Sequence, residues 1–263
     1  MRRARALVWL LALAATSCGA PLLKLPVGPG VPAPDAVDLL ATATATCRRV
    51  STITAEISVS GSVHDSRVRG RLLAGLAVPA SLYMEAPAPF GAPLFVLGAR
   101  EDDATLVLPR DKRVLAHGRP DEVIEAIAGV PLGPSDLRAT LTGCPTGASQ
   151  DAPEARALGA TWRVVGTAPA QYLRRDGSGP WRLVSVVHPG ADGWRVDYTN
   201  FLSDLPRAIH LVSTTKGRFD LRMELSQVDV NVTLEPSTFD VKIPADVRPM
   251  TIDELRSGEP LSR

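Results

Sequence analysis

The chain has 263 residues, a formal net charge of +1 and a hydrophobic content of 45%. This length fits one large all-β domain or two small ones, of which we favour one, and a near-neutral charge without a basic stripe gives no reason to expect nucleic acid as a partner. The 23 prolines and 21 glycines, together with few aromatic residues, are typical of many short strands joined by turns.

The N-terminus has the pattern of an export signal. Three arginines within the first five residues precede an apolar stretch, Leu7 to Ala15, that is too short to span a bilayer, and small residues follow up to Cys18. The pattern resembles a bacterial lipoprotein signal peptide over residues 1–17, which implies that Cys18 becomes the lipidated N-terminus. Ala15 departs from it, because Leu is usual three positions before the cysteine, and an ordinary secretory signal with a chance cysteine is the alternative.

Residues 18–34 are rich in proline and glycine, which predicts an extended tether that does not pack against the domain. Residues 35–50 then place apolar side chains on one stripe at helical spacing. Threonines weaken this helix, so we expect it to pack against a sheet. The stripe is formed by Ala36, Leu40, Ala43, Cys47 and Val50.

A strand pattern begins at Ser51, where apolar and polar residues alternate through Val59. The other predicted strands cover residues 67–78, 81–86, 94–100, 104–108, 113–118, 161–166, 171–175, 181–188, 194–198, 219–226, 228–234 and 239–243. Residues 146–158 are expected to form a polar connection. We expect a mainly β domain at residues 35–245, with about eleven strands in one antiparallel order, followed by a tail at residues 246–263. A sheet with one apolar face tends to curl or close around an apolar interior.

Two short helices interrupt the strands between Pro120 and Pro145. Pro120 is typical of a first helical position and Gly129 of a helix end, while Ser135 and Gly143 have these roles in the second helix. Each helix is apolar on one side only, so we expect the pair to cover the opening of the sheet as a lid. The lid residues expected to face the interior are Val123, Ile124, Ile127, Leu137 and Leu141.

Alternation along the strands also selects candidates for the lining of a cavity. They are Leu72, Leu82, Met84, Leu106, Trp181 and Leu221. For any single one of them, ordinary core packing is the alternative. An apolar cavity of this kind would take lipid chains or hydrophobic peptides.

Cys47 and Cys144 would both lie in an oxidising compartment if the chain is exported. A disulfide between them would connect the first helix to the end of the lid. Two buried, unpaired cysteines are the alternative, and the sequence does not decide between them.

The loop from Ala86 to Leu94 is stiffened by three prolines, and Phe90 lies at its tip between Pro89 and Gly91. An apolar tip could touch a bilayer or a partner. A turn whose Phe folds back onto the mouth of the barrel is the equal alternative.

The sequence lacks an HExxH motif, a Cys/His pattern with metal-ligand spacing, a nucleophile elbow and a Walker loop. Its four histidines are dispersed along the chain. We therefore expect no enzymatic activity, no cofactor and no metal site.

Several of these stretches together resemble the LolA/LolB group of periplasmic lipoprotein carriers, and the LolB outer-membrane lipoprotein receptors in particular. The likeness extends from about Val50 to Val241, and its most specific part is DEVIEAIAGVPLGPSDLRATLTGCP within the lid. The strand WRVDY at residues 194–198 and the loop PFG at residues 89–91 are also similar, although Phe90 replaces the usual Leu.

The resemblance implies an unclosed β-barrel with a helical lid and a cavity for the acyl chains of lipoproteins. It further implies an outer-membrane, lipid-anchored monomer that faces the periplasm, receives acylated lipoprotein cargo from a soluble LolA-type carrier and releases it into the membrane. Phe90 would then be the membrane-contacting tip. A lipid-binding or glycolipid-binding module, or a structural envelope lipoprotein, of the same fold is the alternative hypothesis.

Overall fold

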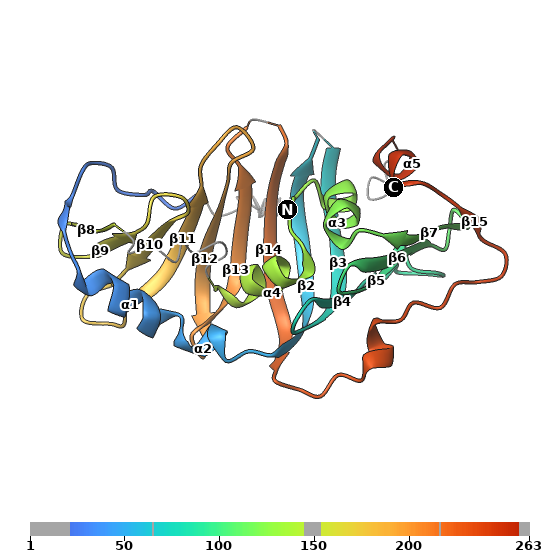
Figure 1. Ribbon diagram of the computed structural model, residues 1–263, viewed down its shortest axis with the longest axis horizontal. Coiled ribbons are helices and arrows are strands. Elements are labelled where there is room, and N and C mark those ends of the chain that lie inside the picture. The colour runs from blue at the N-terminus through green and yellow to red at the C-terminus, as the bar shows by residue number, and fades with distance from the viewer. Residues whose placement is uncertain (1–21, 65, 145–153, 216, 258–263) are drawn as a thin grey trace, which may run out of the picture.

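The computed structural model describes residues 22–64, 66–144, 154–215 and 217–257, so the predicted signal peptide and Cys18 lie outside the described residues (Figure 1). One 15-stranded sheet runs through this part of the chain in the order β1-β8-β9-β10-β11-β12-β13-β14-β2-β3-β4-β5-β6-β7-β15. Its strands are β1 (Val31–Pro32), β2 (Thr52–Val63), β3 (Ser66–Ala77), β4 (Ser81–Ala86), β5 (Phe95–Arg100), β6 (Asp103–Leu108), β7 (Arg113–Gly118), β8 (Ala155–Leu158), β9 (Trp162–Val165), β10 (Ala170–Arg174), β11 (Arg182–His188), β12 (Trp194–Leu202), β13 (Leu205–Ser213), β14 (Phe219–Val230) and β15 (Arg248–Pro249). The helices are α1 (Asp35–Ala43), α2 (Ala45–Arg48), α3 (Pro120–Ala128), α4 (Pro134–Thr142), α5 (Ile252–Ser257) and the 3₁₀ helix η1 (Pro236–Phe239).

The sheet is not closed, because its end strands β1 and β15 do not pair with each other within the described residues. The prediction of a mainly β, unclosed architecture is confirmed. Two details are corrected. The described residues contain more strands than about eleven, and the order is not wholly antiparallel, since β15 pairs in parallel with β7.

Two of the additional strands lie where the alternation of apolar and polar residues is poor. In β13, Leu205, Ile209 and Leu211 are buried, but Pro206 and His210 obscure the pattern. In β8, all four residues are half-buried, and the strand depends on pairing with β1 and β9.

Two strand predictions near the C-terminus are wrong. The strand expected at residues 228–234 is the end of β14, which continues through a register shift after Ser226 to Val230. The strand expected at 239–243 is absent from this described segment. Phe239 instead ends η1. Its carbonyl oxygen lies against Gly98 of β5, so that a Cβ added to this glycine would be only 2.3 Å from the oxygen.

Alternation along the long central strands places one face of the sheet in the core. Ile53, Ala55 and Ile57 of β2 are buried, whereas the residues between them are half-buried or exposed. In the register, Ile57 lies opposite Leu72 of β3 and Leu225 of β14, so apolar side chains meet across three strands.

Helices α1, α3 and α4 lie over this apolar inner face (Figure 1). Helix α1 contacts β8, β9 and β11, while the lid helix α4 contacts β3, β4 and β13. The lid helices have their predicted ends, because Gly129 and Gly143 adopt the left-handed conformation with φ of 68° and 73°. The helix predicted over residues 35–50 is corrected to two helices. Thr44 leaves helical geometry between them, and its hydroxyl donates to the Leu40 carbonyl at 2.7 Å.

The segment after the predicted anchor is not an unpacked tether. The backbone N–H of Leu23 donates to Oδ2 of Asp197 at 2.9 Å, and Arg195 donates to the Leu23 carbonyl. Arg195 and Asp197 also form a two-armed ion pair on the outer face of β12, with both nitrogen–oxygen distances at 2.7 Å. Further along, Val31 pairs with Ala157 of β8. A buried ion pair that also satisfies a peptide group holds this stretch of backbone against the sheet.

The C-terminal tail also returns to the sheet. Strand β15 lies against β7, and helix α5 contacts α3 with Leu255 only 2% exposed. Lys112 and Asp246 form an ion pair at 2.7 Å near the start of this return.

Candidate functional site

An apolar cavity of about 140 Å³ lies between the lid and the inner face of the sheet. Strands β2 to β5 form one side of it, strands β13 and β14 contribute from the other, and the lid helices α3 and α4 cover it. The lining side chains are almost all aliphatic. The cavity can therefore accept hydrocarbon, whose burial stabilises a complex by about 25 cal/mol per Å².

Seven of the residues selected from the sequence line this cavity. Strand alternation and the 3.6-residue helical period bring them to one place from five elements. They are Leu72, Met84 and Leu221 from the sheet, with Ile124, Ile127, Leu137 and Leu141 from the lid.

The remaining lid residue, Val123, lies elsewhere. Its side chain is fully buried on the side of α3 that faces the end of β7. It lies so close to Gly118, the last residue of β7, that a Cβ added to this glycine would be 2.8 Å from a methyl carbon of Val123. Val123 and Ile124 are adjacent on the helix and differ by about 100° in direction, so they cannot both point into the cavity.

Three strand candidates are also corrected. Leu82 and Leu106 are fully buried in the core and do not line the cavity, because alternation fixes the face of a strand but not the distance along it to the cavity. Trp181 lies just before β11, near α1. The guanidinium groups of Arg163 and Arg175 lie 4.9 and 5.0 Å from its ring centre.

Sequence reasoning missed the lining residues that belong to connections. Val130 and Leu132 come from the turn between the lid helices, while Pro87 and Leu94 come from the two ends of the Phe90 loop. Loops have no periodicity that would assign a face. The sequence feature that could have identified these residues is their apolar character within turns that otherwise consist of glycine and proline.

The Phe90 loop borders this cavity and projects away from it. Phe90 is 90% exposed, so its side chain does not fold back over the mouth. The guanidinium of Arg110 donates to the carbonyls of Phe90 and Ala92, both at 3.2 Å, and Gly91 supplies the turn with a φ of 78°. The loop is thus held by its backbone and presents one aromatic side chain to the outside.

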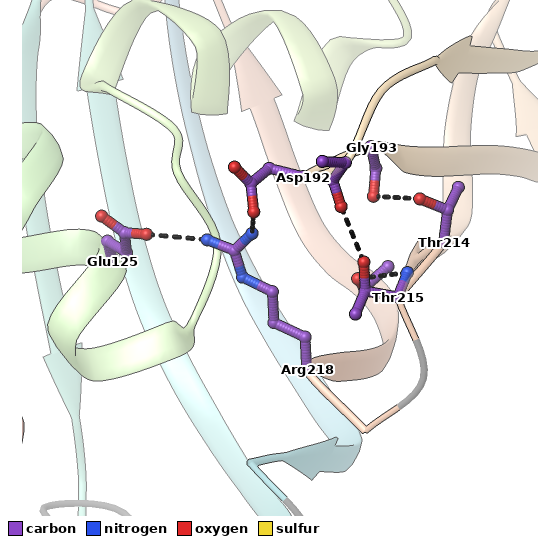
Figure 2. Close-up of polar contacts among 8 residues, drawn as sticks. Glu125, Asp192, Gly193, Thr214, Thr215 and Arg218 are labelled. Carbon is purple, nitrogen blue, oxygen red and sulfur yellow. Dashed lines mark hydrogen bonds and ion pairs between the residues drawn. The ribbon is translucent and has the colours of Figure 1, made fainter.

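Two polar contacts hold the lid on the sheet. Arg218 bridges Glu125 of helix α3, at 3.0 Å, and Asp192 of the β11–β12 turn, at 2.7 Å (Figure 2). Figure 2 also shows that turn joined to the end of β13, where the Thr214 hydroxyl donates to the Gly193 carbonyl at 2.8 Å. On α4, Arg138 donates to the Val50 carbonyl at 2.8 Å, and burial lowers the pKa of its guanidinium.

A disulfide joins Cys47 at the end of the first helical region to Cys144 just after α4. The bridge therefore ties the lid to the segment that leads into β2. It lies at the opposite end of the lid from the Arg218 contact with α3.

The cavity contains one buried polar side chain that has no partner. Thr140 of α4 is 0% exposed, lines the cavity and makes no hydrogen bond through its hydroxyl to any described residue. The two arginines that also border the cavity, Arg69 and Arg71, alternate with the inward Leu72 and so belong to the outer face of β3.

No family model and no curated protein matches the sequence. Among solved structures, a LolA superfamily protein from Nitrosomonas europaea is similar, with a TM-score of 0.51 and 10% identity over 78% of this chain and 97% of that one. The chain has a LolA-like fold. An outer membrane lipoprotein-sorting protein domain from Vibrio parahaemolyticus, which its structure title calls putative, gives a TM-score of 0.47 at 13% identity and covers 78% and 95% of the two chains. A DUF1329 family protein from Desulfovibrio piger gives 0.47 at 10% identity and covers 80% and 98%.

In the described part of the chain, no helix is long and apolar enough to cross a membrane. Within the same residues, no group of three or more His, Cys, Asp or Glu side chains is placed to hold a metal ion.

Proposed function

We propose that the protein is a lipoprotein, anchored through Cys18 in the outer membrane and facing the periplasm, that binds the acyl chains of other lipoproteins and helps insert them into that membrane. The observation that carries the proposal is the aliphatic cavity beneath a two-helix lid. Cargo would arrive on a soluble LolA-type carrier. No covalent step is required, because transfer needs only that the acyl chains be more stable in the bilayer than in the cavity.

The lid must move for this function. A cavity of about 140 Å³ is smaller than the roughly 300–1,000 Å³ of most small-molecule sites, so a long acyl chain needs more room than the closed lid leaves. Opening would release the Arg218 and Arg138 contacts of the two short helices, while the Cys47–Cys144 disulfide would keep the end of α4 attached. The exposed Phe90 would enter the bilayer during release.

The small cavity also supports a second candidate. A protein that binds one lipid or glycolipid chain needs less volume than a receptor for cargo with several chains, and the same fold would serve it. Both candidates bury hydrocarbon beneath the lid, and they differ in the ligand that is bound in the cell.

Mass spectrometry of co-purified lipid would separate them. The full chain should be exported as a Cys18→Ala variant, which retains residues 22–33 and their contacts with the sheet. Triacylated lipoprotein peptides would support the receptor, and glycolipids or single-chain lipids would support the alternative. A protein free of lipid, and unable to bind added acyl chains, would rule out both.

A cavity-filling variant gives the matched test. Gly70 lies opposite Val59 on the cavity side of β3, and a Cβ built there would have no heavy atom within 4 Å. Gly70→Leu should therefore bring an apolar side chain to the cavity with no contact at its Cβ, and should weaken binding of a fluorescent fatty-acyl probe. Ser60→Leu, on the outer face of β2, is the control and should bind normally. Normal binding by the Gly70 variant would show that acyl chains do not use this cavity.

A further inference from the structure

Thr140 is the exception among the buried threonines that lie in the described helices or directly after one. The Thr44 hydroxyl donates to the Leu40 carbonyl at 2.7 Å, and the Thr142 hydroxyl donates to the Arg138 carbonyl at 2.9 Å. In both cases the hydroxyl bonds the carbonyl four residues earlier, which is a common pattern for threonine within a helix or at its end. The Thr140 hydroxyl makes no such bond to any described residue, and Thr140 is one of the residues that line the cavity.

The position of Thr140 on α4 explains why this residue lies at the cavity. Leu137, Thr140 and Leu141 are spaced by three and four residues, so all three belong to one helical face, and all three line the cavity. An aliphatic residue at position 140 would continue the apolar surface. The sequence has placed a hydroxyl there, in the middle of that surface.

Water is a poor partner for this hydroxyl. A buried water is retained when it makes two to four hydrogen bonds. The cavity wall offers one buried side-chain hydroxyl among the described lining residues, and the main-chain groups of the lining strands are paired in the sheet. The Thr140 hydroxyl is therefore a polar group without a protein partner among the described residues, and a suitable ligand could satisfy it.

We propose that the Thr140 hydroxyl donates a hydrogen bond to the carbonyl oxygen of the ester or amide that attaches an acyl chain. The proposal rests on the proposed acyl-chain function and deepens it, because it names the chemical group that the cavity recognises. The ester or amide would lie against α4, while the methylene chain lies along the aliphatic strands. A site built to bond a polar group rejects an analogue without it more strongly than an apolar pocket rejects an extra methylene.

The test compares an ester lipid with its ether analogue, which has the same chains but no carbonyl. Affinities of a lysophospholipid ester and the matching ether would be measured by displacement of a fluorescent fatty-acyl probe from the full-length Cys18→Ala protein. We expect a preference of about tenfold for the ester, which corresponds to about 1.4 kcal/mol and to one net hydrogen bond. Thr140→Val should remove that preference by weakening ester binding alone, and Thr140→Ser should retain it.

Two controls separate recognition from structure. Thr142→Val removes a hydroxyl that is already bonded within α4, so it should leave the ester preference intact. Thermal unfolding of the Thr140→Val variant should occur at an unchanged or higher temperature, because an unsatisfied hydroxyl is lost.

Four results would overturn the proposal. Equal losses of ester and ether affinity in Thr140→Val would show a purely structural role. An unchanged ester preference in that variant would show that another group reads the carbonyl. Equal binding of both lipids by the wild type would show that the protein does not recognise the carbonyl, although it would still bind acyl chains. Binding of neither lipid would overturn the acyl-chain function as well.

Discussion

Phe90 is the most exposed aromatic side chain in the described structure and stands on a loop whose ends line the cavity. Because 90% of its surface is already in contact with water, Phe90→Glu should change the free energy of unfolding by less than about 0.5 kcal/mol. Binding of an acyl probe should persist, and transfer of the probe to vesicles should slow. Stopped-flow transfer would measure this, with Val27→Glu, at a 93% exposed position, as the matched control. Equal transfer rates in the two variants would remove Phe90 from the release step.

His188 gives the protein a specific dependence on pH. Its ring stacks on Trp194 with centres 3.9 Å apart, and burial lowers the pKa of the imidazole below its ordinary value of 6.5, although Asp136 opposes the shift. The unfolded chain therefore binds this proton at a higher pH than the folded chain does. The contribution of His188 to stability should be present above pH 6.5 and should decline as the pH falls from there towards the folded pKa.

The measurement is the free energy of unfolding by urea between about pH 5 and about pH 7.5. A His188→Gln variant should show a shallower loss on acidification than the wild type, whatever its absolute stability. Parallel curves for the two proteins would show that His188 does not set the slope.

From the sequence, a site residue could be predicted only by the face of the helix or strand on which it lies. The helical period and the alternation along a strand report nothing more. The period of α3 correctly brought Ile124 and Ile127 to the cavity and failed for Val123, which points about one quarter-turn away. Leu82 was assigned to the inner face, where it lies, but its depth along β4 depends on the three-dimensional curvature of the sheet. The role of Thr140 depends on a missing hydrogen bond, which no sequence pattern reports.

At the scale of elements, Arg218 connects the lid helix α3 to the β11–β12 turn through Glu125 and Asp192. Both carboxylates are more than one third exposed, so Arg218→Gln should cost only about 1 kcal/mol of unfolding free energy. The lid should open more often, and an acyl probe should dissociate several-fold faster.

Dissociation rates measured by fluorescence would test this connection. Arg174→Gln is the matched control, because Arg174 at the end of β10 pairs with the exposed Asp176 and does not contact the lid through this pair. We expect its dissociation rate to equal that of the wild type. Equal rates for the Arg218 variant would mean that this ion pair does not limit lid opening.

Elements with strong local signals were predictable, and those that depend on neighbours were not. The start of α3 at Pro120 and the helix ends before Gly129 and Gly143 agree with the prediction, and α4 begins at Pro134, one residue before the predicted Ser135. Strand β8 has no alternation of its own and forms because β9 and β1 offer hydrogen-bonding partners. Strand β15 is two residues long and exists only as an addition to β7.

At the scale of the whole molecule, the Arg195–Asp197 pair holds the N-terminal segment on the outer face of the sheet. Asp197 is 3% exposed, so Asp197→Ala would leave Arg195 and the Leu23 N–H without their partner in a largely dry site. We expect a loss of about 3 kcal/mol in unfolding free energy and faster proteolysis before residue 30.

Urea denaturation and timed proteolysis would measure these effects. The control is Asp176→Ala, which removes the exposed partner of Arg174 and should cost less than about 1 kcal/mol. Similar losses in both variants would show that the buried pair is no more important than a surface pair.

The contact between Leu23 and β12 also limits how far the domain could move from a membrane. Cys18 lies five residues before Leu23, and an extended chain spans at most about 3.5 Å per residue, so an acylated Cys18 would keep this point of the sheet within about 18 Å of the headgroups. A long flexible linker would let the domain search a hemisphere of periplasm. With so short a connection, encounters with a carrier would depend on lateral diffusion in the plane of the bilayer, and the carrier would have to approach the membrane surface to meet its partner.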